Sequence, residues 1–320
     1  MYTAAFDLVR RHVTEGRLPS AVFGVATADG TVALDAFSAD AADRYPLFSI
    51  TKPLVGIAVA RAIERGLLTL DTPLATALPG FDGAREDVVR LRHLVSHTSG
   101  ISEPPLDPAP PLRTVLATAG RDFAPGAASR YSTIAFEGIA ALLEQATGMP
   151  WDAAVAEWTT ELAADGISSD LSDAATIGDA ADAGVDMARF TAGRNAGAGL
   201  AARADDLLRL GSALLRIGAG ETSGILQPAT LGMMLRPITG DIPRLEPYVA
   251  SRGQDWGVTW NLRSRAPGLI DQDVYGHGGW AGTEFWVHPT AGVAWVLLTN
   301  RAMREGFDLD ALDNAVVAAR

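Results

Sequence analysis

The chain contains a single lysine, Lys52, and its other 25 basic residues are arginines. Ser49 stands three residues before it, in the stretch Leu47–Leu54, which has the pattern of a helix start. On a helix this spacing places both side chains on one face, within reach of each other. A buried lysine can lose its proton and act as a base, whereas an arginine cannot. The pair therefore predicts a serine nucleophile activated by a lysine.

A structural interpretation of the same stretch must also be weighed. Ser-Ile-Thr-Lys is a plausible helix cap followed by a lysine exposed to solvent. Given the number of serines in the chain, one would precede a given lysine at this spacing by chance about one time in twenty. Other residues of the chain are needed to distinguish a helix cap from a catalytic serine–lysine pair.

Composition limits the class of protein. The 320 residues are 48% hydrophobic and 20% charged, which is enough for a packed core in one large domain or two. A net charge of −12 without a basic run argues against nucleic acid and anionic membranes as partners. The absence of cysteine excludes disulfides and cysteine-based metal or redox chemistry.

The location of the protein is predicted from two patterns. Residues 2–16 alternate as in an amphipathic helix and lack the long apolar core of a signal peptide. No apolar run reaches the length of about 18 residues that a membrane-spanning helix needs. We therefore expect a cytoplasmic protein, secreted only if a leader was removed, and no membrane partner.

Strand patterns stand near both ends of the chain, and helical periodicity prevails between them. Asp29-Gly30 between two apolar runs predicts a β-hairpin. The predicted strands are 21–27, 31–37, 256–262, 273–275, 284–288 and 293–298, and the predicted helices are 2–16, 49–66, 88–97, 134–145, 151–164, 204–215 and 309–320.

This order predicts an α+β fold, with an antiparallel sheet drawn from both chain ends, flanked by helices, and a mainly helical inserted region. We expect residues 1–60 and 196–320 to form the sheet region, residues 61–195 the helical region, and the active site to lie between them. The proline-rich segment 102–112 is either a wall of a binding cleft or only a stiff connection.

Three other known sequence motifs were considered, and none of them predicts a functional site in this chain. Residues 197–202 match the dinucleotide glycine pattern but follow Arg194-Asn195 rather than a strand. His93 and His97 have zinc-ligand spacing, but Leu94 stands where the zinc-protease motif needs glutamate, so we expect no metal and no cofactor. The Gly-x-Ser-x-Gly elbow is absent, which argues against the common α/β-hydrolase fold.

Two later motifs can complete the serine–lysine pair. Tyr131 follows a glycine turn at a predicted helix start, and His277-Gly278-Gly279-Trp280 stands where a loop enters a predicted strand. Lys52 and Tyr131 could share proton transfer, and the glycines could let a substrate lie close to the strand backbone. The N–H groups of Ser49 and Trp280 could form an oxyanion hole.

The order Ser49-x-x-Lys52, Tyr131-Ser132-Thr133 and His277-Gly278-Gly279 resembles the serine β-lactamase superfamily. It is most similar to the class C β-lactamases and to their relatives among D-Ala-D-Ala carboxypeptidases and esterases, and it implies their β-lactamase/transpeptidase-like fold. The resemblance spans roughly residues 20 to 301, and its further landmarks are residues 94–101, 123–126, 199–207 and 296–300.

The resemblance implies a role for each motif. Ser49 would be the acylated nucleophile, and Lys52 and Tyr131 the proton-transfer pair. His277 would take the position of the family's third-motif lysine, as in many esterase-like members. Trp280 and Ser49 would supply the oxyanion N–H groups.

Two departures from the family pattern concern the substrate. Thr133 stands where the second motif usually has asparagine, and His-Gly-Gly replaces the Lys-Thr-Gly of efficient class C enzymes. Both weaken the case for β-lactam or peptide recognition more than the case for acylation. With Thr133, Gly278, Gly279 and Trp280 as substrate-binding residues, we expect a carboxylesterase or acyl hydrolase acting on a small-molecule ester or amide.

Several alternatives stay open at this point. They are a β-lactamase, a D-alanyl-D-alanine carboxypeptidase of the penicillin-binding type, an acyltransferase and a non-catalytic binding protein of the same fold. The expected cytoplasmic location argues against the first two, because their targets lie outside the membrane. The complete set of motif residues argues against the last. The acyl group, the leaving group and the oligomeric state are not readable from the sequence.

Overall fold

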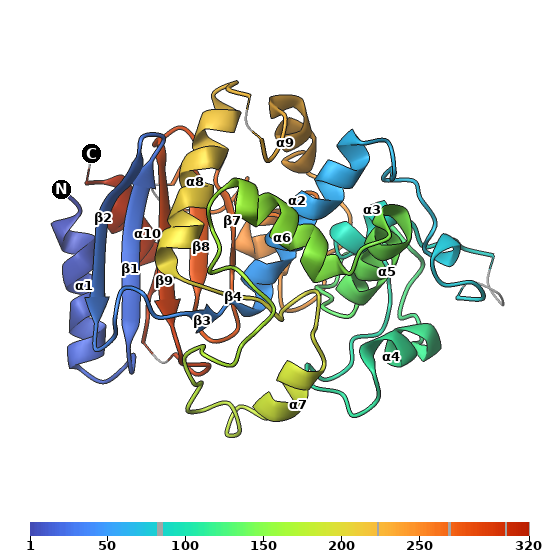
Figure 1. Cartoon of the computed structure of the whole chain (residues 1–320), viewed down its shortest axis with the longest axis horizontal. Helices are drawn as coiled ribbons and strands as arrows, with labels where there is room; N and C mark the ends of the chain where they lie inside the picture. The colour runs from blue at the N-terminus through green and yellow to red at the C-terminus, as the bar shows by residue number, and fades with distance from the viewer. Residues whose placement is uncertain (82–85, 223, 268–269, 305, 320) are drawn as a thin grey trace.

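The computed structural model describes residues 1–81, 86–222, 224–267, 270–304 and 306–319. Within these residues an antiparallel sheet has seven strands in the order β2-β1-β9-β8-β7-β6-β5 (Figure 1). The strands are β1 Ala21–Thr27, β2 Gly30–Phe37, β5 Asp255–Trp256, β6 Asn261–Leu262, β7 Tyr275–Gly278, β8 Glu284–His288 and β9 Val293–Thr299.

The two ends of the chain meet in this sheet. β1 pairs with β2 across the predicted hairpin turn and with β9 on its other side. The predicted α+β fold, with an antiparallel sheet drawn from both chain ends, is therefore confirmed. A second, two-stranded sheet joins β3 Tyr45–Pro46 to β4 Ala201–Ala202, just before the stretch that contains Ser49.

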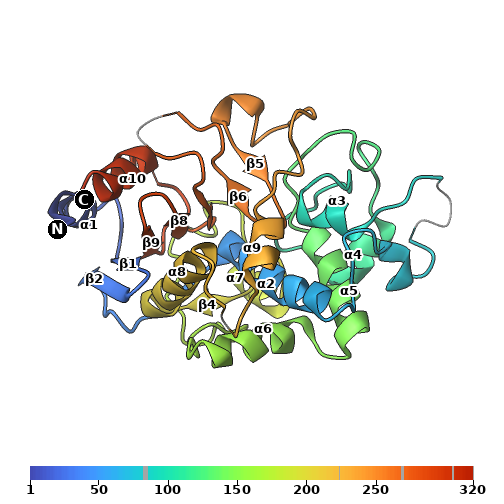
Figure 2. The ribbon, with the colours of Figure 1, turned by 90° about the horizontal axis from the view of Figure 1, so that it is seen from above.

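Helices cover both faces of the large sheet. α8 Ala204–Gly218 lies on one face, and α1 Thr3–Thr14 and α10 Leu309–Val317 lie on the other (Figure 2). β9 consequently buries both of its faces: Val296 belongs to the core beneath α8, and the adjacent Trp295 to the core beneath α1 and α10. This explains why β9 is apolar throughout instead of alternating.

The remaining helices form a layer beside the sheet (Figure 1). At its centre lies α2, which is buried from Thr51 to Ala62, as its continuous apolar pattern predicts. The helices of this layer are α2 Thr51–Glu64, α3 Leu91–Val95, α4 Leu112–Thr118, α5 Ala135–Thr147, α6 Trp151–Glu161, α7 Met187–Ala192 and α9 Pro228–Met234.

Several sequence-based boundaries are corrected. Helices α4, α7 and α9 were not predicted; the short apolar patterns of α4 and α9 stand beside prolines. The predicted strand 256–262 is split between β5 and β6, because Thr259 has a φ of +65° and turns the chain. The predicted strand 273–275 is displaced to β7, which contains His277. Arg320, the end of the predicted last helix, lies outside the described residues.

The predicted division into residues 1–60 with 196–320 and residues 61–195 stays a prediction. Among the described residues, no helix has both the length and the apolarity needed to cross a membrane.

Candidate active site

Ser49 lies in a 3-10 turn, Phe48–Ile50, that leads directly into α2. The residue before it, Phe48, has a φ of +46°, a left-handed conformation that costs a non-glycine residue about 1–2 kcal/mol. Its ring is held between Phe190 and Trp280, each with its centroid 5.0 Å away. Packing of this kind can maintain a strained backbone, and such strain is common at functional sites.

Lys52 is fully buried in the first turn of α2. Its Nζ lies 3.0 Å from Ser49 Oγ, 2.9 Å from the carbonyl oxygen of Gly197 and 3.3 Å from Thr133 Oγ1. Burial lowers the pKa of Lys52 from 10.5 to about 7, and the charge of Glu103 partly opposes this shift. A large fraction of Lys52 is therefore a neutral amine at neutral pH.

The neighbours of Lys52 suit a neutral amine. An NH₂ group has two hydrogens to donate and one lone pair. The hydrogens can go to Gly197 O and Thr133 Oγ1, while the lone pair accepts the hydroxyl hydrogen of Ser49. The predicted pair is thus within hydrogen-bonding distance, and the exposed lysine of the cap interpretation is excluded by its burial.

Tyr131 lies four residues before α5, not at its first turn as predicted. Its ring centroid is 4.7 Å from Lys52 Nζ, and its hydroxyl is 3.5 Å from His277 Nε2. Burial holds the pKa of Tyr131 well above 10, although a hydrogen bond with Ser49 lowers it. Tyr131 consequently keeps its proton at neutral pH, so it can pass a proton on but cannot serve as the first base.

His277 is fully buried on β7 and is neutral. Burial and the charge of Lys52 lower the pKa of His277 to about 3. Its Nδ1 donates to the carbonyl oxygen of Gly278 at 2.7 Å, so Nε2 is left as an acceptor towards Tyr131. The position of the family's third-motif lysine therefore carries no positive charge here.

The glycines after His277 lie close to other atoms of the protein, and their predicted use in substrate binding stays a prediction. A Cβ on Gly279 would stand 2.3 Å from the carbonyl oxygen of Leu47, and one on Gly278 would stand 2.7 Å from Glu284 Oε2. They make room for atoms of the protein itself. Trp280 lies beyond β7, in the turn to β8, and not on the strand.

That turn is fixed against the chain before Ser49. Thr283 Oγ1 donates to the carbonyl oxygen of Leu47 at 3.1 Å. Within the described part of the chain, the N–H groups of Ser49 and Trp280 make no hydrogen bond. Both are therefore available to an oxyanion, as predicted, though their use stays a prediction.

His97, which the sequence suggested only as a zinc ligand, was not predicted to belong to this site. Its Nδ1 accepts the N–H of Ser132 at 3.1 Å, and its carbonyl oxygen accepts the N–H of Arg130 at 2.9 Å. Its ring lies 4.5 Å from that of Tyr131 between centroids. His97 therefore holds the Tyr131 segment from both sides. The only sequence signal for such a role was its place in the landmark 94–101.

Two further residues near Lys52 were also missed. Gly197 belongs to the glycine pattern rejected as a dinucleotide site, and its carbonyl oxygen accepts from Lys52. A Cβ there would meet Thr133 Cγ2 at 3.1 Å, so a larger residue would have to push Thr133 away from Lys52. Glu103, in the proline-rich segment, binds the turn that carries Thr133. Neither contact is recoverable from spacing along the chain.

An aromatic wall, defined here as Tyr131, Tyr248 and Trp256, lies beside the pair. The ring centroids are 5.1 Å apart for Tyr131–Tyr248 and 5.5 Å for Tyr131–Trp256. Burial raises the pKa of Tyr248 to about 12, so this hydroxyl also stays neutral. The wall offers an apolar surface that is uncharged at neutral pH.

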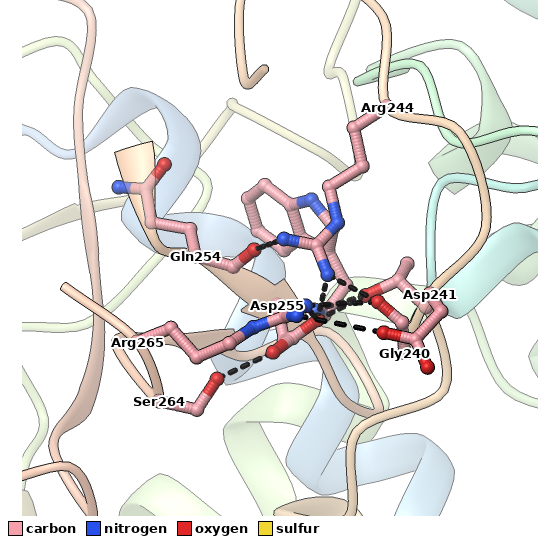
Figure 3. Close-up of polar contacts among 9 residues, drawn as sticks. Gly240, Asp241, Arg244, Gln254, Asp255, Ser264 and Arg265 are labelled. Atoms are coloured by element: carbon pink, nitrogen blue, oxygen red, sulfur yellow. Dashed lines mark hydrogen bonds and ion pairs between the residues drawn. The ribbon is translucent and has the colours of Figure 1, made fainter. Parts of the chain in front are cut away.

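A buried ion-pair network anchors this wall (Figure 3). Arg244 binds Asp255 and the carbonyl oxygen of Gln254, and Arg265 Nη2 reaches Asp255 Oδ1 at 3.2 Å. The flanking backbone exchanges two hydrogen bonds of 2.8 Å with Ser129, two residues before Tyr131. The network therefore fixes the segment of Tyr248 and Trp256 against the segment of Tyr131.

The proline-rich segment does line a cavity. A cavity of about 800 Å³ lies between residues 106–113 and residues 189–195, and Phe190, which stacks on Phe48, forms part of its wall. Ser49 is not among its lining residues. Among the described residues, no group of three or more histidine, aspartate or glutamate side chains is placed to hold a metal ion.

The fold and the site together define a serine–lysine protein with a β-lactamase/transpeptidase-like fold. A buried lysine amine contacts the serine at the start of the central helix, and a tyrosine and a neutral histidine lie beside them. The chain belongs to the beta-lactamase family, whose model matches residues 5–320. The predicted family resemblance is therefore confirmed.

Individual relatives include an esterase and an acyltransferase. Esterase EstB of Burkholderia gladioli is 38% identical over 136 residues, which are 35% of this chain and 34% of EstB. ML-236A carboxylate methylbutanoyltransferase mlcH of Penicillium citrinum is 39% identical over 72 residues, 18% of this chain and 17% of mlcH.

A solved structure matches over almost the whole chain. EstCE1, a hydrolase with promiscuous acyltransferase activity, has a TM-score of 0.81 and 24% identity, and the match covers 98% of this chain and 97% of EstCE1. The curated relatives, in contrast, align over about a third of their length or less. The structural match supports the fold.

Proposed function

We propose that this protein is a serine hydrolase that forms an acyl-enzyme on Ser49 and acts on carboxylic esters. The observation that carries the proposal is the 3.0 Å contact between Ser49 Oγ and a buried lysine whose pKa is about 7. A base with this pKa is half deprotonated at neutral pH, which suits a general base.

In the first step, Ser49 Oγ attacks the ester carbonyl carbon while its proton moves to Lys52 Nζ. The carbonyl π electrons move onto the oxygen, which the N–H groups of Ser49 and Trp280 stabilise. Collapse of this intermediate breaks the bond to the alcohol oxygen. That oxygen takes the Tyr131 proton as Lys52 returns its proton to Tyr131, and the alcohol leaves.

In the second step, a water molecule attacks the acyl carbon and gives its proton to Lys52. The bond to Ser49 Oγ breaks, Ser49 regains the proton and the carboxylic acid is released. The four groups Ser49, Lys52, Tyr131 and His277 act here as proposed catalytic residues. His277 accepts a hydrogen bond from Tyr131 and orients its hydroxyl.

The uncharged surroundings support an ester over a β-lactam or a D-alanyl peptide. Penicillins and peptide C-termini carry a carboxylate, and a cation near the third motif would bind it. Here that position is the neutral His277. Arg304, which binds the carbonyl oxygen of Gly282 in the turn after β7, is paired with Glu284 at 3.2 Å. A neutral small-molecule ester therefore fits this site better than an anionic amide.

Acyl transfer is the second candidate. The relative mlcH is a methylbutanoyltransferase, and EstCE1 combines hydrolysis with acyltransferase activity. The aromatic wall of Tyr131, Tyr248 and Trp256 would favour an alcohol over water as the acyl acceptor by covering the serine with apolar surface. Addition of a small alcohol to the assay separates the two, since a transferase converts the acyl-enzyme into a new ester.

Intact-mass spectrometry tests the proposal directly. The protein is mixed briefly with a p-nitrophenyl ester or with a penicillin, beside Ser49→Ala and the control Ser172→Ala, which changes an exposed serine. An ester adduct that requires Ser49 and clears with time is the expected result. A penicillin adduct that clears quickly would instead indicate a β-lactamase, and a lasting one a penicillin-binding protein. No adduct from either probe would contradict an acyl-enzyme hydrolase.

A further inference from the structure

The carboxylate of Glu103 lies at the end of the turn that carries the second motif. It accepts Ser132 Oγ–H at 2.8 Å and the N–H of Thr133 at 2.8 Å, and the N–H of Ile134 lies 3.3 Å from both of its oxygens. The residue as a whole is exposed to solvent, but its carboxylate turns towards the protein. These donors lie at the N-terminus of α5, where a negative charge is favourable.

This turn connects Glu103 to the proposed proton-transfer pair. Tyr131 immediately precedes the residues that Glu103 binds, and Thr133 contacts Lys52 Nζ through its own hydroxyl at 3.3 Å. Thr133 stands where the family pattern has an asparagine amide. Glu103 thus reaches Lys52 through Thr133 and fixes Tyr131 through Ser132.

Charged and titratable groups face Lys52 from four elements. His97 follows α3, Tyr131 precedes α5, His277 lies on β7, and Glu103 lies in the proline-rich segment. Burial keeps the pKa of both histidines low and that of Tyr131 high, so these three are uncharged at neutral pH. Among the described residues, Glu103 is therefore the carboxylate whose charge acts on Lys52.

The charge of Glu103 itself follows from its contacts. Burial raises the pKa of Glu103 above its ordinary value, although the hydrogen bonds from Ser132 and Thr133 and the charge of Lys52 oppose this shift. Convergent donors of this kind favour the ionised form of the carboxylate.

We propose that Glu103 is a positioning residue of this site: its carboxylate holds the Tyr131–Thr133 turn in place, and its negative charge sets the fraction of Lys52 that is neutral. A negative charge favours the protonated amine. Glu103 thereby sets the pH above which Lys52 can accept the proton of Ser49. The catalytic part of this inference rests on the function proposed above.

The lone lysine allows a direct test without any substrate. Labelling with ¹³C-lysine gives one side-chain signal, that of Lys52, whose pKa can be followed by NMR in the full-length protein. In Glu103→Gln, which keeps the size of the side chain and removes the charge, we expect the pKa of Lys52 to fall by at least about half a unit. The acid limb of the acylation rate should move to lower pH by the same amount.

Two variants serve as controls. Glu144→Gln removes a carboxylate from the last turn of α5, where it pairs with Arg113 at 3.0 Å, and should leave the Lys52 titration unchanged. Glu103→Asp keeps the charge but withdraws it by one methylene, so it should lower the pKa of Lys52 by less than Glu103→Gln. If Glu103→Gln does not fold, Glu103→Asp still shows whether the carboxylate of Glu103 affects the pKa of Lys52.

The outcomes separate this inference from the proposed function. An unchanged Lys52 titration in Glu103→Gln would overturn the inference, even if Ser49 is acylated. A uniform loss of rate without movement of the acid limb would show a purely structural role and would also overturn it. Conversely, the shifted titration can be observed whether or not an ester acylates Ser49.

Discussion

Lys52 and Arg244 are both buried basic side chains, but only Arg244 is paired with a carboxylate. The Arg244 side chain is only 2% exposed and Asp255 4%, and the two form an ion pair within the network of Figure 3. Lys52 is fully buried too, yet within the described part of the chain its hydrogen-bonding partners are two hydroxyl groups and a carbonyl oxygen, with no carboxylate among them. Burial lowers the pKa of both groups.

Because arginine and lysine differ in their ordinary pKa, this difference in pairing gives Arg244 and Lys52 different roles. The ordinary pKa of arginine is so high that Arg244 stays protonated beside the carboxylate of Asp255. It can therefore stabilise the structure but cannot exchange a proton. Lysine without a contacting carboxylate falls to a pKa of about 7 and can exchange a proton. In this protein, the buried cation that is paired with a carboxylate stays charged, and the buried cation without such a partner can lose its proton.

The sharpest test of this comparison is Lys52→Arg. Arginine keeps a positive charge at this place but cannot accept the proton of Ser49. We expect the rate of Ser49 acylation to fall at least about 10³-fold at every accessible pH, as measured by time-resolved intact mass with a p-nitrophenyl ester. A rate within about tenfold of the native rate would show that Lys52 is not the base.

Arg244→Met should destabilise the protein by about 3 kcal/mol, because it leaves Asp255 buried without its charged partner. Urea unfolding monitored by tryptophan fluorescence measures the change. Arg265→Met is the matched control, since Arg265 contacts the same carboxylate but its side chain is 50% exposed. It should cost less than about 1 kcal/mol. Equal effects from both variants would contradict the distinction between buried and exposed pairing.

Lys52→Met should stabilise the folded protein, whereas Arg244→Met should destabilise it. The unfolded chain holds the Lys52 proton up to the ordinary pKa of 10.5, whereas the folded protein releases it near 7. The resulting penalty on folding is fully present at pH 7 and below, and it disappears as the pH rises to 10.5.

We therefore expect Lys52→Met to stabilise the fold by about 2 kcal/mol near pH 6, after the lost hydrogen bonds are counted. The gain should be absent above about pH 10. Urea unfolding at both pH values measures it. A gain that does not depend on pH would mean that the lysine charge is not its cause.

The smallest effect concerns an exposed cation. Arg65 lies 2.6 Å from Glu157, and both side chains are more than a third exposed. Glu157→Gln should change stability by less than about 0.5 kcal/mol, because solvent screens the pair. A loss comparable to that of Arg244→Met, measured under the same conditions, would show that pairing outweighs burial.

Much of the fold could be predicted from local patterns. The N-terminal hairpin, the buried helix α2, the long helix α8 and strands β8 and β9 were predicted from apolar periodicity and turn residues. The predictions missed the helices α4, α7 and α9 and the strands β3 and β4, and they misplaced the short strands β5 to β7. Two-residue strands are defined by pairing with a neighbour, and no pattern within the strand itself encodes this.

The same limit applies to the site. Ser49 and Lys52 were recognisable because a helical turn brings them together, and Tyr131 and His277 because their motifs follow in a known order. Glu103 and Gly197 were not recognisable, since each reaches the site through contacts between segments far apart in the chain. His97 was seen as a landmark, but its contact with Ser132 was not.

The sequence by itself determined the serine that we propose as nucleophile, the only lysine beside it and the sheet drawn from both chain ends, because these depend on short-range spacing and apolar periodicity. Only the tertiary structure decided that Lys52 is neutral enough to act as a base, that His277 carries no charge and that Glu103 faces this site. Those properties depend on burial and on the field of distant neighbours, which arise only when the chain is packed.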